Sequence, residues 1–79
     1  MMEEYQKARM GIEDFFLKYQ CKVQFAEEEI KKGYSEHISF RALDKNNNIF
    51  AEGKKIWIND ISTDEKLTNY LKNLISRKI

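Results

Sequence analysis

The chain has 79 residues, of which 42% are apolar and 34% are charged, and its 14 Lys and Arg against 13 Asp and Glu give a formal net charge of +1. A chain of this length builds one modest hydrophobic core, so we expect a single domain over residues 1–79 and no enclosed enzyme cleft. The near-neutral charge excludes a global field that attracts nucleic acid or an anionic membrane, so any such attraction needs a local patch.

The cellular compartment is predicted from what the sequence lacks. Cys21 is the one cysteine, so no intramolecular disulfide is available. There is no apolar N-terminal run of the signal-peptide type and no stretch approaching a membrane span. We therefore expect a cytoplasmic protein without a membrane partner.

Residues 1–19 predict an amphipathic helix, because apolar side chains recur there at intervals of three and four residues. Gly11 interrupts this pattern, and if it faces the sheet it marks a close approach of the helix backbone. The apolar stripe consists of Tyr5, Ala8, Ile12, Phe15, Phe16 and Tyr19.

Residues 21–25 predict a short, half-buried strand, because Cys21, Val23 and Phe25 alternate with polar residues. As a small apolar side chain Cys21 suits the buried side, and no base adjoins it in sequence that would make it a nucleophile. The charged segment 26–33 that follows is interpreted either as one or two helical turns or as a long solvated loop.

Residues 34–59 predict a β-hairpin, which is the strongest pattern in the chain. Ile38, Phe40 and Ala42 alternate with polar side chains before the Asn-rich loop 45–48, and apolar residues resume after it. Asn tolerates the positive φ that tight hairpin turns require, so we expect a two-residue turn at Asn46 and Asn47.

Counting outward from that turn predicts the register of the hairpin. The predicted pairs are Leu43 with Phe50, Ala42 with Ala51, Arg41 with Glu52, and Phe40 with Gly53. Continued further, the count sets Ile38 against Lys55, so we predict a one-residue bulge at Gly53–Lys54 that brings Ile56 opposite Ile38. The predicted core face carries Ile38, Phe40, Ala42, Ala51, Ile56 and Ile58. The predicted outer face carries His37, Ser39, Arg41, Leu43, Phe50, Glu52, Lys55 and Trp57.

A second helix is predicted after residue 62. Ser62 and Glu65 have the spacing of a capping box, and the apolar stripe that follows consists of Leu67, Tyr70, Leu71, Leu74 and Ile75. The element order α-β-β-β-α predicts an α+β fold, in which two helices pack on one face of a three-stranded antiparallel sheet.

The sequence predicts neither a metal site nor catalytic residues. His37 is the only histidine, and no second His or Cys stands where it would complete tetrahedral ligation. The run 44–48 begins like a calcium loop, but Ile49 takes the position that needs Gly and Lys55 the position that needs a bidentate Glu. We therefore expect no metal, no cofactor and no enzymatic activity.

The element order resembles that of the double-stranded-RNA-binding domain, and residues 33–37 are similar to the loop and histidine near the first strand of that family. The family places a Lys-Lys pair at the start of its last helix, whereas Lys54 and Lys55 lie within a predicted strand here. Residues 38–75 also resemble, in layout, the three-strand-plus-helix DNA-binding modules of some tyrosine recombinases. Neither resemblance includes a specific motif, so we assign no family.

The predicted outer face combines aromatic and basic side chains, and three interpretations of it are open. Interfaces between proteins are enriched in Trp and Arg, so the first hypothesis is a non-catalytic protein-interaction module. Such a module, a regulator or an inhibitor, would bind another protein or a second copy of itself through this face or an edge strand. The second hypothesis is a nucleic-acid-binding domain that uses Arg41, Lys54, Lys55 and Trp57. The third is a purely structural role without a ligand, in which Trp57 folds over the sheet edge or meets a third layer. The predicted binding residues are Trp57, Phe50, Arg41, Leu43, Lys55 and His37.

Overall fold

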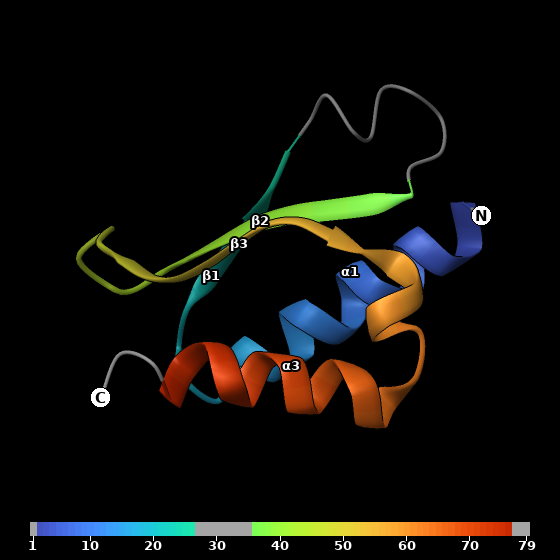
Figure 1. Ribbon diagram of the computed structural model, residues 1–79. Coiled ribbons are helices and arrows are strands. Elements are labelled where there is room, and N and C mark those ends of the chain that lie inside the picture. The colour runs from blue at the N-terminus through green and yellow to red at the C-terminus, as the bar shows by residue number, and fades with distance from the viewer. Residues whose placement is uncertain (1, 27–35, 77–79) are drawn as a thin grey trace.

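The computed structural model describes residues 2–26 and 36–76, and its elements follow the predicted α-β-β-β-α order (Figure 1). They are α1 (Met2–Leu17), β1 (Lys22–Phe25), β2 (His37–Leu43), β3 (Ile49–Trp57), the 3-10 helix η1 (Ile58–Ile61) and α3 (Asp64–Ser76). The α+β prediction is confirmed. Most of segment 26–33, for which both helix and loop were left open, lies outside the described residues.

The strands form one antiparallel sheet in the order β1-β2-β3, and both helices lie on one side of it (Figure 1). Helix α1 packs against β1 and β2, α3 packs against β3, and the two helices also contact each other. Each helix has one apolar stripe, so packing both on the same face of the sheet buries all three apolar surfaces together.

The core lies between the sheet and the helices. Phe16 and Ile12 of α1, Ile38 of β2 and Leu71 of α3 are its largest fully buried side chains. Burying a side chain of this size stabilises the fold by about 1.5–3 kcal/mol. The predicted core face of the hairpin is confirmed, because all six of its residues are buried: Ile38, Phe40, Ala42, Ala51, Ile56 and Ile58.

Gly11 marks a close approach between the two helices rather than between a helix and the sheet. A Cβ atom at Gly11 would overlap the Cδ2 atom of Leu67 in α3. The absence of a side chain at this position therefore allows α1 and α3 to approach each other, and the helical cost of glycine is offset by that packing.

The second helix is capped by Thr63, and the prediction of a capping box at Ser62 and Glu65 is wrong. The Thr63 Oγ1 atom accepts a hydrogen bond of 3.2 Å from the backbone N–H of Lys66. The Ser62 hydroxyl donates instead to the carbonyl of Asn59, at 3.2 Å, because η1 brings that carbonyl within reach. The helix accordingly begins at Asp64, one residue after its cap.

The hairpin closes through the side chain of Asp44, and the predicted two-residue turn is wrong. The Asp44 Oδ1 atom accepts hydrogen bonds of 2.9 Å from the backbone N–H groups of both Asn46 and Asn48. The backbone N–H of Asn47 donates to the Asp44 carbonyl at 3.0 Å, and Asn47 has a φ of 63°. A turn followed by a left-handed residue is the arrangement of a three-residue hairpin loop.

Beyond the loop, the predicted pairs Ala42 with Ala51, Arg41 with Glu52, and Phe40 with Gly53 are all present. The pair of Leu43 with Phe50 is not, because Leu43 pairs with Ile49 and leaves Phe50 as the extra residue of a bulge. In such a bulge two consecutive side chains fall on the same side of the sheet. The position of Phe50 on the outer face was therefore predicted wrongly.

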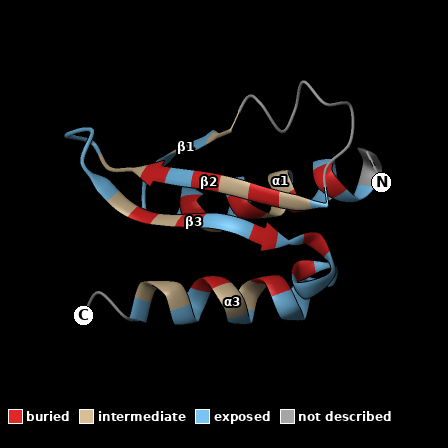
Figure 2. Ribbon diagram, turned by 45° about the horizontal axis from the view of Figure 1, so that its top comes forward, coloured by how far each residue is buried: buried red, intermediate tan, exposed pale blue. Residues whose placement is uncertain are grey.

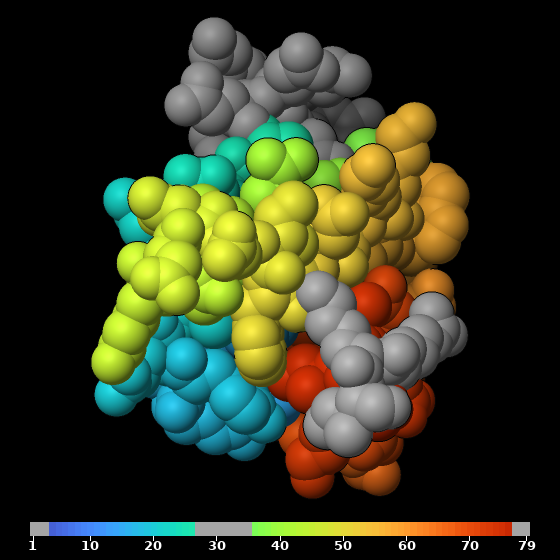
Figure 3. Space-filling model, turned by 90° about the vertical axis from the view of Figure 1, so that its left-hand side faces the viewer, coloured from blue at the N-terminus to red at the C-terminus, as the bar shows by residue number. Residues whose placement is uncertain are grey.

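Phe50 lies instead on the helix side of the sheet, beside the end of α1. Its ring centroid is 6.3 Å from that of Phe16 and 5.4 Å from that of Tyr19. In the view from the hairpin end, the yellow atoms of β3 reach between the blue end of α1 and the red α3 (Figure 3). The ring thus covers the open end of the core.

The second bulge lies where the sequence predicts one, and it brings Ile56 opposite Ile38 as expected. Lys54 and Lys55 together stand opposite the single residue Ser39. Lys55 has a φ of 50°, and its backbone N–H donates to the Ser39 Oγ atom at 2.9 Å. The Ser39 hydroxyl thereby stabilises the bulge.

Candidate functional site

The face of the sheet opposite the helices, called the outer face below, carries side chains from all three strands. Every second residue of β2 is buried, and the positions between are more exposed (Figure 2). In β3 the buried positions are Ala51, Gly53 and Ile56. The residues directed to the outer face are Lys22, Gln24, His37, Ser39, Arg41, Leu43, Ile49, Glu52, Lys54, Lys55 and Trp57.

The second bulge places two lysines next to each other on this face. Gly53 and Ile56 are both buried, and Lys54 and Lys55 between them are both exposed. In a regular strand consecutive side chains point to opposite faces, so one of the two lysines would face the core. The bulge therefore adds one positive charge to the outer face.

The outer face is locally basic, although the net charge of the chain is only +1. Its cations come from all three strands: Lys22 from β1, Arg41 from β2, and Lys54 and Lys55 from β3. Glu52 is the one carboxylate among the outer-face residues, and its Oε2 atom lies 3.7 Å from the Arg41 Nε atom. Both side chains are about half exposed, 54% for Arg41 and 40% for Glu52, so the ion pair stabilises the fold by at most about 1 kcal/mol.

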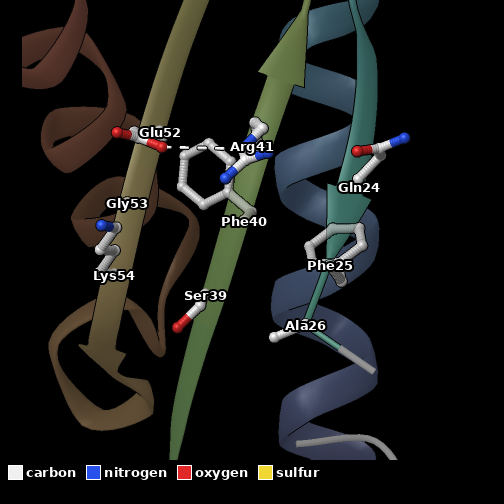
Figure 4. Close-up of a pocket in the computed structure, with 9 residues that line it drawn as sticks. All are labelled: Gln24, Phe25, Ala26, Ser39, Phe40, Arg41, Glu52, Gly53 and Lys54. Carbon is white, nitrogen blue, oxygen red and sulfur yellow. Dashed lines mark ion pairs between the residues drawn. The ribbon is translucent and has the colours of Figure 1, made fainter. Parts of the chain in front are cut away.

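A hollow of about 250 Å³ crosses the middle of the sheet, between the polar side chains of the outer face (Figure 4). Ser39 of β2, Gly53 of β3 and Ala26, which follows β1, are small and leave this space open. Arg41 and Lys54 flank it with positive charge, and Gln24 lines it from β1. Its lining consists of Gln24, Phe25, Ala26, Ser39, Phe40, Arg41, Glu52, Gly53 and Lys54.

Trp57 stands at one end of this face, with 55% of its surface exposed. It pairs with His37 across the two strands, and the two rings meet edge to face with their centroids 5.8 Å apart. The neighbours of Trp57 in sequence, Ile56 and Ile58, are both buried. The backbone that carries the indole is thus anchored on both sides.

The structure brings four of the six predicted binding residues onto the basic part of this face: Trp57, His37, Arg41 and Lys55. Leu43 lies at the hairpin end of the face, between Lys22 and Ile49, and Phe50 lies on the other side. Sequence reasoning missed Lys22. It named Lys54 for nucleic-acid binding but did not place it on the outer face. The signal for Lys54 was the three-residue spacing between Gly53 and Ile56, which leaves two residues to point outward.

Other candidate chemistry is weaker. Burial and, to a smaller extent, the carboxylate of Asp44 raise the pKa of the Cys21 thiol, which keeps the thiol protonated near neutral pH. Among residues 2–26 and 36–76 no three His, Cys, Asp or Glu side chains gather closely enough to hold a metal ion. Within the same residues no helix has the length and apolar character needed to cross a membrane.

Comparison with protein-family models, with characterised proteins and with solved structures gives no match. The function must therefore be inferred from the geometry of the outer face.

Proposed function

We propose that the chain is a non-catalytic nucleic-acid-binding module that holds its ligand on the outer face of the sheet. The observation that carries this proposal is the gathering of four cations from three strands on one exposed face. Among the described residues directed to that face the one carboxylate is Glu52, which is paired to Arg41. Phosphate contacts from Lys and Arg supply most of the affinity of such proteins. A local excess of three positive charges provides those contacts in a chain whose net charge is only +1.

The alternative partner, another protein or a second copy of the chain, is less well supported by the arrangement of apolar residues. The centre of a protein interface is typically apolar and poor in charge. On this face the exposed apolar residues Ile49 and Trp57 stand at opposite ends of β3, roughly 25 Å apart at about 3.3 Å per residue. The outer-face positions between them are charged, and Phe50, the neighbour of Ile49, packs on the helix side of the sheet.

The proposed surface differs from the one that the resemblance to double-stranded-RNA-binding domains implies. Helix α3 begins with Asp64 and Glu65, and carboxylates at a helix N-terminus repel phosphate. The paired lysines lie on the sheet instead. The proposal therefore concerns the sheet face and not the ends of the helices.

A salt series tests the proposal. Binding of labelled oligonucleotides, measured by fluorescence anisotropy, should weaken with a log–log salt slope of about −3, since each phosphate contact on a single strand contributes about −0.7. The double variant Lys54→Gln/Lys55→Gln should lose about half of that slope. The matched control, Lys7→Gln/Lys72→Gln, removes the same charge from exposed positions on the helices and should leave the slope nearly unchanged.

Two results would contradict the proposal. One is the absence of binding to DNA and RNA at low ionic strength. The other is an equal loss of affinity in both double variants, which would indicate a general charge effect. Self-association that disappears in Trp57→Ala, without any nucleic-acid binding, would assign the face to a protein partner instead.

A further inference from the structure

We infer that the ligand of the outer face is single-stranded nucleic acid, with one base stacked on the indole of Trp57. This inference rests on the proposed function and adds to it the strandedness of the ligand. It depends on the position of an exposed aromatic ring at the end of a line of cations. Base–aromatic stacking combined with a positively charged track is the general mode of single-strand binding.

The indole is presented in a defined place. Trp57 has extended backbone angles, φ −65° and ψ 130°, and the next residue begins η1 with its backbone N–H bonded to the Glu36 carbonyl at 2.9 Å. The indole and the His37 ring lie nearly perpendicular, with an interplanar angle of 81°. With more than half of its surface exposed, the ring can receive a base without any rearrangement of the core.

The cations form a path that leads away from this ring. Lys55 and Lys54 follow it on β3, Arg41 comes next on β2, and Lys22 stands on β1 near the hairpin end. From His37, the partner of Trp57, to Arg41 is four residues, or about 13 Å at 3.3 Å per residue. The path is therefore long enough for several phosphates of one strand.

The hollow lies on this path, between Arg41 and Lys54 (Figure 4). Its volume of about 250 Å³ is several times the roughly 30 Å³ that one water occupies in the liquid. A phosphate group at its mouth would meet the guanidinium and the ammonium together. Charge-assisted hydrogen bonds of this kind are stronger than neutral ones.

Stacking on Trp57 decides between a single strand and a duplex. Lysine and arginine contact the phosphates of either form. In a duplex the faces of the bases are already stacked on one another, so an indole on the protein surface finds no free base. A single strand offers an unstacked base to the ring while its phosphates follow the cations.

Trp57 is the only tryptophan of the chain, so its own fluorescence reports the stacking. We would titrate the protein with three probes of equal phosphate number: a short oligothymidylate, a blunt-ended duplex of two annealed strands, and an abasic single strand. We expect quenching of the tryptophan emission by the oligothymidylate and little quenching by the other two. Trp57→Ala should weaken oligothymidylate binding about 5-fold or more and leave abasic binding unchanged. Trp57→Phe, which keeps a ring, should retain most of the affinity.

The outcomes separate the two claims. Equal affinity for all three probes, with no quenching, would overturn the single-strand inference while the binding function of the outer face stands. Failure of all three probes to bind at low ionic strength would overturn the proposed function itself. A quench that persists in the abasic probe would also refute stacking, because that probe has phosphates but no bases.

Discussion

The left-handed backbone of Lys55 offers a sharp test of the second bulge. Lys55 has a φ of 50°, a conformation that costs about 1–2 kcal/mol for a residue with a Cβ atom but little for glycine. Lys55→Gly removes that strain and loses part of the gain to the greater freedom of the unfolded chain, so we expect a net stabilisation of about 0.5–1 kcal/mol. Lys54, which does not have a positive φ, is the matched control. Lys54→Gly should destabilise the strand by about 0.5–1 kcal/mol.

The two variants lose the same charge from the same face, so they should bind an oligonucleotide equally. They should differ in stability, because only Lys55 has a positive φ. The expected gap of about 1.5 kcal/mol corresponds to roughly 6–12 °C in melting temperature for a domain of this size. Thermal unfolding followed by circular dichroism measures the gap, and anisotropy with an oligonucleotide measures the binding. If Lys55→Gly were as destabilising as Lys54→Gly, the bulge that turns both lysines outward would not be present as described.

Three further substitutions test the hairpin by urea unfolding. Asp44→Ala removes the acceptor of two loop N–H groups and should cost about 1–2 kcal/mol; an unchanged midpoint would mean that the loop does not need this carboxylate. Glu52→Gln removes the pairing with Arg41 and should lower the free energy of unfolding by no more than about 1 kcal/mol. It should also tighten nucleic-acid binding, because it removes a negative charge from the outer face. Weaker binding would contradict the proposed role of the face. Gly53→Ala places a Cβ atom 2.8 Å from the Phe40 ring and should cost about 1–3 kcal/mol, whereas a gain in stability would show that the core has spare room there.

The core face of the hairpin was predictable because burial imposes a strict alternation. Ile38 and Ile56 had to share the core, and the residue count between them allowed this only with a bulge near Gly53. The bulge could therefore be predicted, because without it the strand register and the hydrophobic pattern disagree.

Phe50 could not be placed by the same reasoning. Its position depends on a bulge next to the loop, and the loop geometry depends on Asp44 accepting two backbone N–H groups. The alternation of apolar and polar residues does not indicate these hydrogen bonds. The contacts of Phe50 with Phe16 and Tyr19 join segments that are distant in sequence. Local periodicity does not predict contacts of this kind.

The sequence pattern placed only two of the four cations on the outer face. Arg41 and Lys55 followed from alternation in the hairpin. Lys22 joins the patch because β1 pairs with β2, and the predicted strand 21–25 came without a partner. The candidate site is thus a property of strand pairing, and the cations that compose it are spread over thirty-odd positions of the chain.

The most direct test of the central claim is a map of the residues that respond to a short single-stranded oligonucleotide, recorded as changes in amide chemical shift by NMR. We expect the largest changes at Lys54, Lys55 and Arg41 and at the indole N–H of Trp57, with small changes along the exposed sides of α1 and α3. Changes concentrated on the helices, or absent from the outer face while binding occurs, would contradict the account.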